Sequence, residues 1–256
     1  MNTGARFAYA QARLQARHGM RPTEQLWRRL ASTGDLANFL QQAQHTTLRP
    51  WVLGMQATQA SHTLELSLRQ HFRHYIDEVA SWLPANWGAV VRAVKRLPDL
   101  PVLQYLLRGE AAPQWLLEDA RLRPFTSENM ATRLEAMHNS DYDYLATAWQ
   151  RGDPLYKAWL EQWQQQWPAS RRFAAGLAYL ARLLRQYLDG PHRETAAAGG
   201  LQRQRLVAGL NLAFRRYSFE PAAVCAHLGL VALDLEKLRG ELLRRALFAE
   251  TAGGRV

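Results

Sequence analysis

Two predicted helices carry the side chains that could ligate a metal. His71 and His74 lie one turn apart, with Glu78 four residues after His74, and Glu135 and His138 form a Glu-x-x-His pair elsewhere. Di-iron helical bundles use two such pairs together with Glu residues from two further helices. This chain has one such pair, and the His71 helix presents its residues in the wrong order. The pattern therefore predicts ordinary, partly exposed side chains, and we expect neither a metal site nor a cofactor.

Nucleophilic and phosphate-binding motifs are missing from the sequence. It contains neither a Walker-type glycine loop nor a Gly-x-Ser-x-Gly elbow, and its acidic residues are scattered. Cys225 is the only cysteine, so no intrachain disulfide is possible, and a small buried side chain is its simplest interpretation. We name no catalytic residue and expect the protein not to be an enzyme.

One segment resembles a nucleic-acid-binding unit. Within 221–248, an apolar helix, a turn at Gly229 and a second helix loosely match a helix-turn-helix. Four basic residues of the second helix could face phosphates, namely Lys237, Arg239, Arg244 and Arg245. Two glutamates share that helix, and a tight helical hairpin would give the same pattern. A basic, helical nucleic-acid-binding protein is therefore the alternative function.

The elements that must position these residues are helices throughout. Leu, Ala, Gln, Arg and Glu are abundant, and runs of alternating β-branched residues are absent. Gly, Pro and capping residues divide the chain, with a loop at 45–54. The predicted helices cover about 5–18, 23–30, 35–42, 58–82, 86–97, 102–108, 113–121, 127–139, 141–150, 154–167, 170–189, 201–217, 221–228 and 232–249.

A stretch of small residues divides the chain near its end. Residues 191–200 read as a linker between a helical region at 1–190 and a C-terminal helical segment at 201–256. Five tryptophans precede it and are most simply core anchors: Trp115, Trp149, Trp159, Trp163 and Trp167.

Charge and hydropathy bound the location and the partners. The net charge is +10 and the pI about 10.2, which favours partners of negative potential such as nucleic acid, anionic lipid or an acidic protein. No signal peptide and no stretch of about 18 apolar residues is visible. We expect a cytoplasmic protein without an integral membrane span, or one peripheral to a membrane.

Several segments resemble one protein family in their order along the chain. Their residues are Phe7–Gly19, Asp35–Leu40, Leu97–Gly109 and the turn at Trp115–Glu118. The first is similar to the opening helix of the C-type subunit of bacterial and archaeal V/A-type ATPases, whose eukaryotic counterpart is the d-type subunit. The third resembles the recurrent Leu-Leu-Arg helix of this C/d family. The chain looks like a shortened or diverged member.

The resemblance implies a fold and a role. The C/d family forms a funnel-like array of pseudo-repeated helical subdomains, and Leu177–Gly190 and Leu233–Leu243 read as weak echoes of a repeat. Its members couple the central stalk to the membrane proteolipid ring, so the implied role is a non-catalytic adaptor in ion or proton transport, peripheral to the cytoplasmic membrane face. Basic residues at the ends of helices are the candidate partner contacts: Arg13, Arg17, Arg108, Arg185 and Arg239. Each could instead neutralise the carbonyls at its helix terminus.

Overall fold

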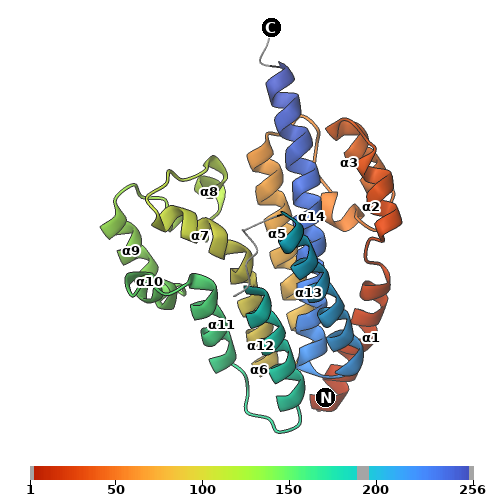
Figure 1. Cartoon of the computed structure of the whole chain (residues 1–256), viewed down its shortest axis with the longest axis vertical. Helices are drawn as coiled ribbons and strands as arrows, with labels where there is room; N and C mark the ends of the chain where they lie inside the picture. Colours follow the sequence, from red (N-terminus) through yellow and green to blue (C-terminus); the bar gives the residue numbers. More distant parts are fainter. Residues whose placement is uncertain (1–2, 189–195, 254–256) are drawn as a thin grey trace.

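The computed structural model of the chain describes the backbone of residues 3–188 and 196–253 and the side chains of 3–188 and 199–248. Within these ranges the regular elements are α-helices and two short 3-10 helices, without a strand, so the all-α prediction is confirmed. The helices form a larger lobe and a smaller lobe beside it (Figure 1).

The larger lobe combines helices from both ends of the chain (Figure 1). They are α1 (Thr3–Gly19), α2 (Glu24–Ala31), α3 (Leu36–Gln44), α4 (Arg49–Val52), α5 (Ser61–Ser81), α6 (Ala85–Ala93), α12 (Ala174–Leu188), α13 (Ala196–Arg216) and α14 (Pro221–Gly253). Side-chain caps set two of the starts. Thr23 Oγ1 accepts from the Leu26 amide at the start of α2, and Asp35 Oδ1 accepts from the Asn38 amide at the start of α3.

The smaller lobe is made from consecutive short elements. They are η1 (Val94–Asp99), α7 (Leu100–Leu107), α8 (Gln114–Glu118), η2 (Arg123–Phe125), α9 (Met130–His138), α10 (Asp143–Gln150) and α11 (Leu155–Gln165). Trp159 and Trp163 stack in parallel, with ring centroids 5.4 Å apart, and Trp163 Nε1 donates to the Val90 carbonyl of α6. Both rings are buried, so these two tryptophans are core anchors, as predicted.

The centre of the larger lobe is the packing of α5 against α14. The predicted apolar stripe of α5 is buried, including Leu64, Phe72 and Ile76. Helix α14 packs against α1, α3, α5, α12 and α13. The prediction of two helices in 221–249 is wrong, because α14 runs through Gly229 without a break. A Cβ at Gly229 would lie 3.1 Å from Leu210 Cδ1, so this glycine allows α13 to approach closely instead of ending a helix.

Two other boundaries differ from the prediction. Residues 196–200 of the expected linker form the first turns of α13, and 191–195 lie outside the described residues. The loop predicted at 45–54 contains α4. The C-terminal segment packs on α1, α5 and α12, so it shares the core of the larger lobe.

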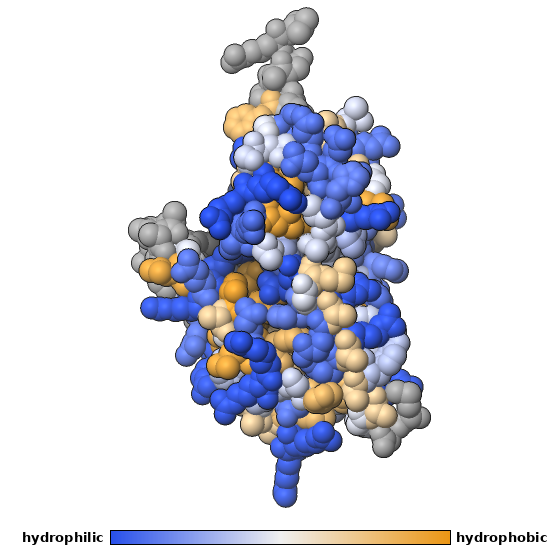
Figure 2. Space-filling model, turned by 90° about the vertical axis from the view of Figure 1, so that its right-hand side faces the viewer, coloured by the Kyte–Doolittle hydropathy of each residue, from blue (hydrophilic) through white to orange (hydrophobic). Residues whose placement is uncertain are grey.

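None of the helices that the structure describes is both long enough and apolar enough to cross a membrane. Figure 2 turns the α1–α3 side of the molecule toward the viewer and shows a mostly hydrophilic surface with smaller apolar areas. The expected funnel of pseudo-repeated subdomains stays a prediction.

Candidate functional site

A cavity of about 540 Å³ opens on the larger lobe between the end of α1 and helices α4, α5 and α14. Its lining is rich in charged and aromatic side chains. The lining residues are Arg17, Met20, Arg21, Thr47, Pro50, Trp51, His71, His74, Tyr75, Glu78, Val231 and Asp234. A cavity of this size can hold a small molecule or several side chains of a partner.

Ion pairs fix the charged groups of this cavity. Arg17 Nη2 lies 2.8 Å from Glu78 Oε1, which joins α1 to α5. Arg21 makes a bidentate contact with Asp234 of α14, at 2.7 and 3.1 Å. Burial raises the pKa of Asp234, while the hydrogen bond from Arg21 opposes that rise. Each arginine is therefore already paired, so a ligand has to bind beside these pairs or exchange with them.

Behind the cavity wall, Tyr75 meets a buried histidine. Tyr75 Oη lies 2.7 Å from His227 Nε2, and His227 is fully buried within α14. His18 stacks on Phe214, with centroids 4.1 Å apart, and its ring lies 6.0 Å from that of His227. Burial raises the pKa of Tyr75. Burial, together with the nearby charges of His18, Arg21 and Arg17, lowers the pKa of His227 to about 3. His227 is therefore neutral at pH 7 and is part of the core.

The buried His227 predicts a loss of stability in acid. Because its pKa falls from 6.5 in the unfolded chain to about 3 in the folded protein, the unfolded state takes up the proton first as the pH drops. Above pH 6.5 this group leaves the free energy of unfolding unchanged. As the pH falls from 6.5 toward 3 the free energy of unfolding decreases, by about 3 kcal/mol between pH 7 and pH 4. Urea unfolding across this range should show a shallower acid loss for His227→Gln than for the wild type. Parallel profiles would contradict the assignment.

The structure separates the residues considered for a metal. His71 and His74 lie on α5, while Glu135 and His138 lie on α9 in the smaller lobe. His71 Nδ1 contacts the Trp51 carbonyl at 3.0 Å, and His138 Nδ1 contacts Asp143 at 2.6 Å. In the described part of the chain, no group of three or more His, Cys, Asp or Glu side chains could hold a metal ion. Cys225 is buried, as predicted, and burial raises its pKa to about 12.

Two of the five predicted partner arginines gather at one edge of the cavity. Arg13 and Arg17 both point to Glu78, at 3.7 and 2.8 Å, and both side chains are more than a third exposed. The Arg13 guanidinium also lies 4.6 Å from the ring centre of Trp82. Both side chains thus reach across to α5 and its end instead of folding back on the carbonyls of α1.

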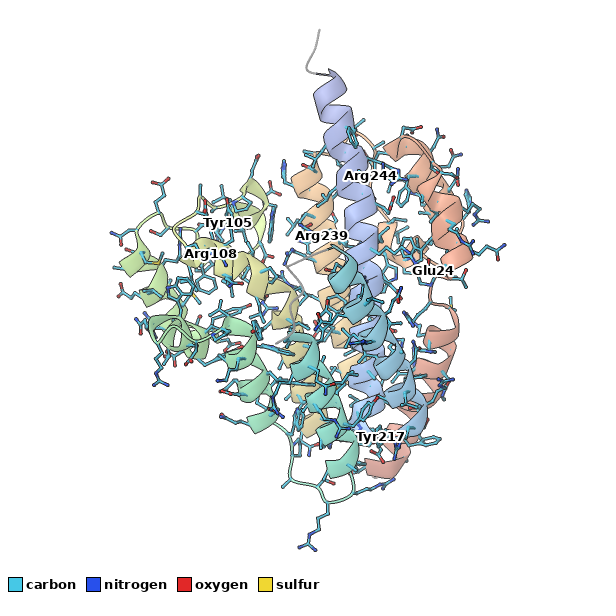
Figure 3. All side chains as sticks on the ribbon, viewed as in Figure 1. Glu24, Tyr105, Arg108, Tyr217, Arg239 and Arg244 are labelled. Atoms are coloured by element: carbon cyan, nitrogen blue, oxygen red, sulfur yellow. The ribbon has the colours of Figure 1, made fainter. Side chains whose placement is uncertain are left out.

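The other three arginines are dispersed. Arg108 is exposed in the smaller lobe, whereas Arg239 lies on α14 in the larger lobe (Figure 3). Arg185 on α12 is exposed and lies 3.5 Å from Gln164. Arg239 pairs with the buried Glu65 of α5, while about half of its own side chain stays exposed. The five residues therefore do not form a single surface.

The predicted helix-turn-helix is not present, because α14 is continuous. Arg245 is buried and donates to the carbonyls of Leu30 and Thr33, which closes the end of α2. Lys237 pairs with Glu24, and Arg244 pairs with Glu241. The unit expected to contact nucleic acid is thus a packing helix, and one of its supposed phosphate contacts is inaccessible.

A set of buried charges lies between the two lobes, and sequence reasoning missed them as a set. The Asp99 carboxylate accepts from Arg73 Nη2 at 2.9 Å and from Tyr142 Oη at 2.8 Å, and Arg73 Nη1 also reaches Asp119 at 2.6 Å. Asp99 and Asp119 are almost completely buried. Arg73 belongs to α5, whereas the two aspartates and Tyr142 belong to the smaller lobe. We call this set the interlobe network.

The neighbouring turn of α5 extends the interlobe network. Arg69 lies 2.7 Å from Glu65 and 3.4 Å from Asp99, and it donates to the Pro98 carbonyl at 2.9 Å. Its guanidinium lies 4.4 Å from the ring centre of Trp115. The one sequence signal was Asp99 itself, an acid that lies among apolar residues just before the helix predicted at 102–108.

The geometry thus supplies oriented ion pairs and a cavity lined by charged and aromatic side chains, which suit binding. No protein-family model, curated protein or solved structure was found that matches this chain.

Proposed function

We propose that this chain is a non-catalytic adaptor that couples the central stalk of a V/A-type rotary ATPase to its membrane proteolipid ring. The observation that carries the proposal is the interlobe network centred on Asp99. A coupling protein must pass force between two partners without bending. Buried charges held by several hydrogen bonds resist separation of the helices that bear them, because an unpaired buried charge is costly.

The edge of the cavity supports a role in contact with a partner. Arg13 and Arg17 are accessible, and an exposed ion pair contributes at most about 1 kcal/mol, so Glu78 can be exchanged for a partner's carboxylate at little cost. The net charge of +10 favours an acidic partner or an anionic membrane face. The choice of a V/A-type ATPase as the complex rests on the resemblance of Phe7–Gly19 and Leu97–Gly109 to the C/d family.

The test is affinity purification of the tagged chain from native membranes and cytosol at low and at moderate salt, with mass spectrometry of what is retained. We expect stalk or ring components of a rotary ATPase at both salt concentrations. The matched variants are Arg13→Glu with Arg17→Glu, and Arg151→Glu with Lys157→Glu as a control of equal charge change. The first pair should reduce recovery at least tenfold, and the second should leave it unchanged.

Other outcomes separate the alternatives. Nucleic acid that is recovered at low salt and lost at moderate salt, without ATPase components, would favour the nucleic-acid-binding function. Intact assembly of the rotary ATPase in cells that lack this chain would overturn the proposal.

A further inference from the structure

Helices α12 and α13 form a positively charged surface. The described residues of 166–219 include eight arginines and no Lys, Asp or Glu, and the two acids of this stretch of sequence, Asp189 and Glu194, lie outside the described residues. Seven of the eight arginines are exposed. We call these seven the arginine face: Arg171, Arg172, Arg182, Arg185, Arg205, Arg215 and Arg216.

The packing of α12 on α13 brings these arginines together on one side of the larger lobe. Tyr217, the first residue after α13, packs on Gly176 in the first turn of α12, and Gly209 of α13 lies against Leu183 of α12, so the two helices run antiparallel. Both helices also pack on α14, and Figure 1 shows α13 in front of it. The two arginines before α12 therefore lie at the same end of the helix pair as the two that close α13.

The charge of the arginine face is not neutralised within the described part of the chain. The eighth arginine, Arg203, is half-buried and pairs with Glu236 of α14, whereas none of the seven exposed arginines forms an ion pair with a described Asp or Glu. Glu220 interacts with Arg172 only through longer-range electrostatics, and burial raises the pKa of its carboxyl. The positive charge is therefore available to a partner outside the chain.

Aromatic rings hold three of the guanidinium groups in place. Those of Arg172, Arg182 and Arg216 lie 5.3, 5.6 and 5.6 Å from the centres of the rings that they cover. A ring stabilises the cation through its π face and leaves the N–H groups in the guanidinium plane free to donate to oxygen. Phosphate oxygens accept such hydrogen bonds in pairs, so these arginines are suited to phosphate groups.

Large apolar side chains lie between these arginines. Leu212 is 44% exposed and lies between Arg205 and Arg215 on the outer side of α13, at helical spacing. Phe219, four residues after Arg215, is 50% exposed although its φ of +68° is a left-handed conformation that favours glycine. Burial within this chain offsets only part of that strain, which favours a contact outside the chain. The surface thus mixes guanidinium groups with apolar side chains and does not separate them.

This mixture discriminates between the anionic partners that a basic surface can bind. A nucleic acid offers phosphates to the arginines, but Leu212 and Phe219 would stay in water beside it. An acidic protein helix needs a continuous apolar strip, which the arginines interrupt. The surface of an anionic bilayer offers both environments, because lipid phosphates lie next to the acyl chains that accept apolar side chains.

We propose that the arginine face binds an anionic phospholipid surface, with Leu212 and Phe219 entering the boundary between headgroups and acyl chains. The guanidinium groups take the lipid phosphates, and the apolar side chains add a contact that phosphates alone cannot give. The inference goes beyond the proposed adaptor role, in which the chain meets the membrane through protein subunits. It does not depend on a rotary ATPase.

The experiment is co-sedimentation of the full chain with vesicles of phosphatidylcholine, either alone or mixed three to one with phosphatidylserine. At low salt, the partition coefficient should be at least tenfold higher for the vesicles that contain phosphatidylserine, and it should fall as salt is added. Arg182→Glu with Arg215→Glu should lower it at least tenfold. Arg151→Glu with Lys157→Glu, an equal charge change at exposed positions of the smaller lobe, should leave it within twofold.

A nitroxide label tests the apolar part of the contact. The native Cys225 is buried, so a label on Leu212→Cys reports from the arginine face. On vesicles that contain phosphatidylserine, this label should become more accessible to oxygen and less accessible to a water-soluble nickel complex. A label on Leu117→Cys, at a leucine of similar exposure in the smaller lobe, should not change.

Three results would overturn the inference: equal binding to the two kinds of vesicle, equal losses in the two charge-reversal pairs, or a label on Leu212→Cys that stays in water on the vesicles. The last result, together with binding of duplex DNA that Arg182→Glu with Arg215→Glu abolishes, would assign the face to nucleic acid. Failure of the adaptor proposal is distinguishable from these results. If the vesicle experiments succeed but purification from native membranes retains no ATPase component, the lipid-binding surface stands without the adaptor role.

Discussion

Replacement of Asp99 by Asn should lower the free energy of unfolding by about 3–5 kcal/mol. The Asp99 side chain is 1% exposed and accepts hydrogen bonds from Arg69, Arg73 and Tyr142. Asn has nearly the same shape but no charge, so it leaves two guanidinium groups in the interior with only part of their compensation. The measurement is urea unfolding followed by circular dichroism at pH 7.

Asp77→Asn is the matched control, since it also replaces an ion-paired aspartate by asparagine, but at an exposed position. Asp77 pairs with Lys95 at 2.5 Å but is 47% exposed, so its loss should cost less than about 1 kcal/mol. Equal effects of the two substitutions would show that burial of the interlobe network contributes nothing to stability. Limited proteolysis should also cut between the lobes of the Asp99 variant first.

The second large effect is expected at Arg245, where substitution by Met should cost about 2–4 kcal/mol. Arg245 donates to the carbonyls of Leu30 and Thr33 at 3.1 and 2.8 Å, and its guanidinium lies 4.3 Å from the ring centre of Phe39. Met fills a similar volume without donors, so the Thr33 carbonyl loses its hydrogen bonds from Arg245 and the Leu30 carbonyl at the end of α2 keeps only backbone donors. Thermal and urea unfolding both report the change.

The neighbouring Arg244→Met supplies the comparison. Arg244 is 48% exposed and pairs with Glu241 at the surface, so a change within about 0.5 kcal/mol is expected. If Arg244→Met lowered the free energy of unfolding more than Arg245→Met, the buried, stabilising role of Arg245 would be refuted. The variants Arg244→Met and Arg245→Met also serve as controls for nucleic-acid binding. If both arginines were replaced together, a loss of DNA affinity could result from unfolding caused by the change at Arg245.

Local signals in the sequence located most of the helices. The helix predicted at 58–82 corresponds to α5, and those predicted at 154–167 and 170–189 contain α11 and α12. The errors arose where a local signal was overridden by packing. Gly229 reads as a helix stop, yet it lies inside α14, where a Cβ would be only 3.1 Å from Leu210 Cδ1 of α13.

Much less of the candidate site could be predicted, for a physical reason. Arg13, Arg17 and Glu78 are brought together by the packing of α1 on α5, and Arg21 pairs with Asp234 from a position 213 residues away. A single sequence contains no information on such contacts that local patterns could reveal. The local sequence around a basic residue does not show whether its side chain will be exposed or, like that of Arg245, buried.

The position of α14 in the chain has a consequence for biosynthesis. This helix forms the centre of the larger lobe, but it is made after every element that packs on it. About 140 residues separate the end of α5 from the start of α14, which at a translation rate of 5–20 residues per second corresponds to about 7–28 s. During that interval the parts of α1, α3 and α5 that pack on α14 lack this partner, although α5 can already pack on α6 and α3 on α4, whereas α9, α10 and α11 find their partners among immediate neighbours. The smaller lobe can therefore complete its packing first, and the surface that stays exposed longest during synthesis is the part of the larger lobe that α14 later covers.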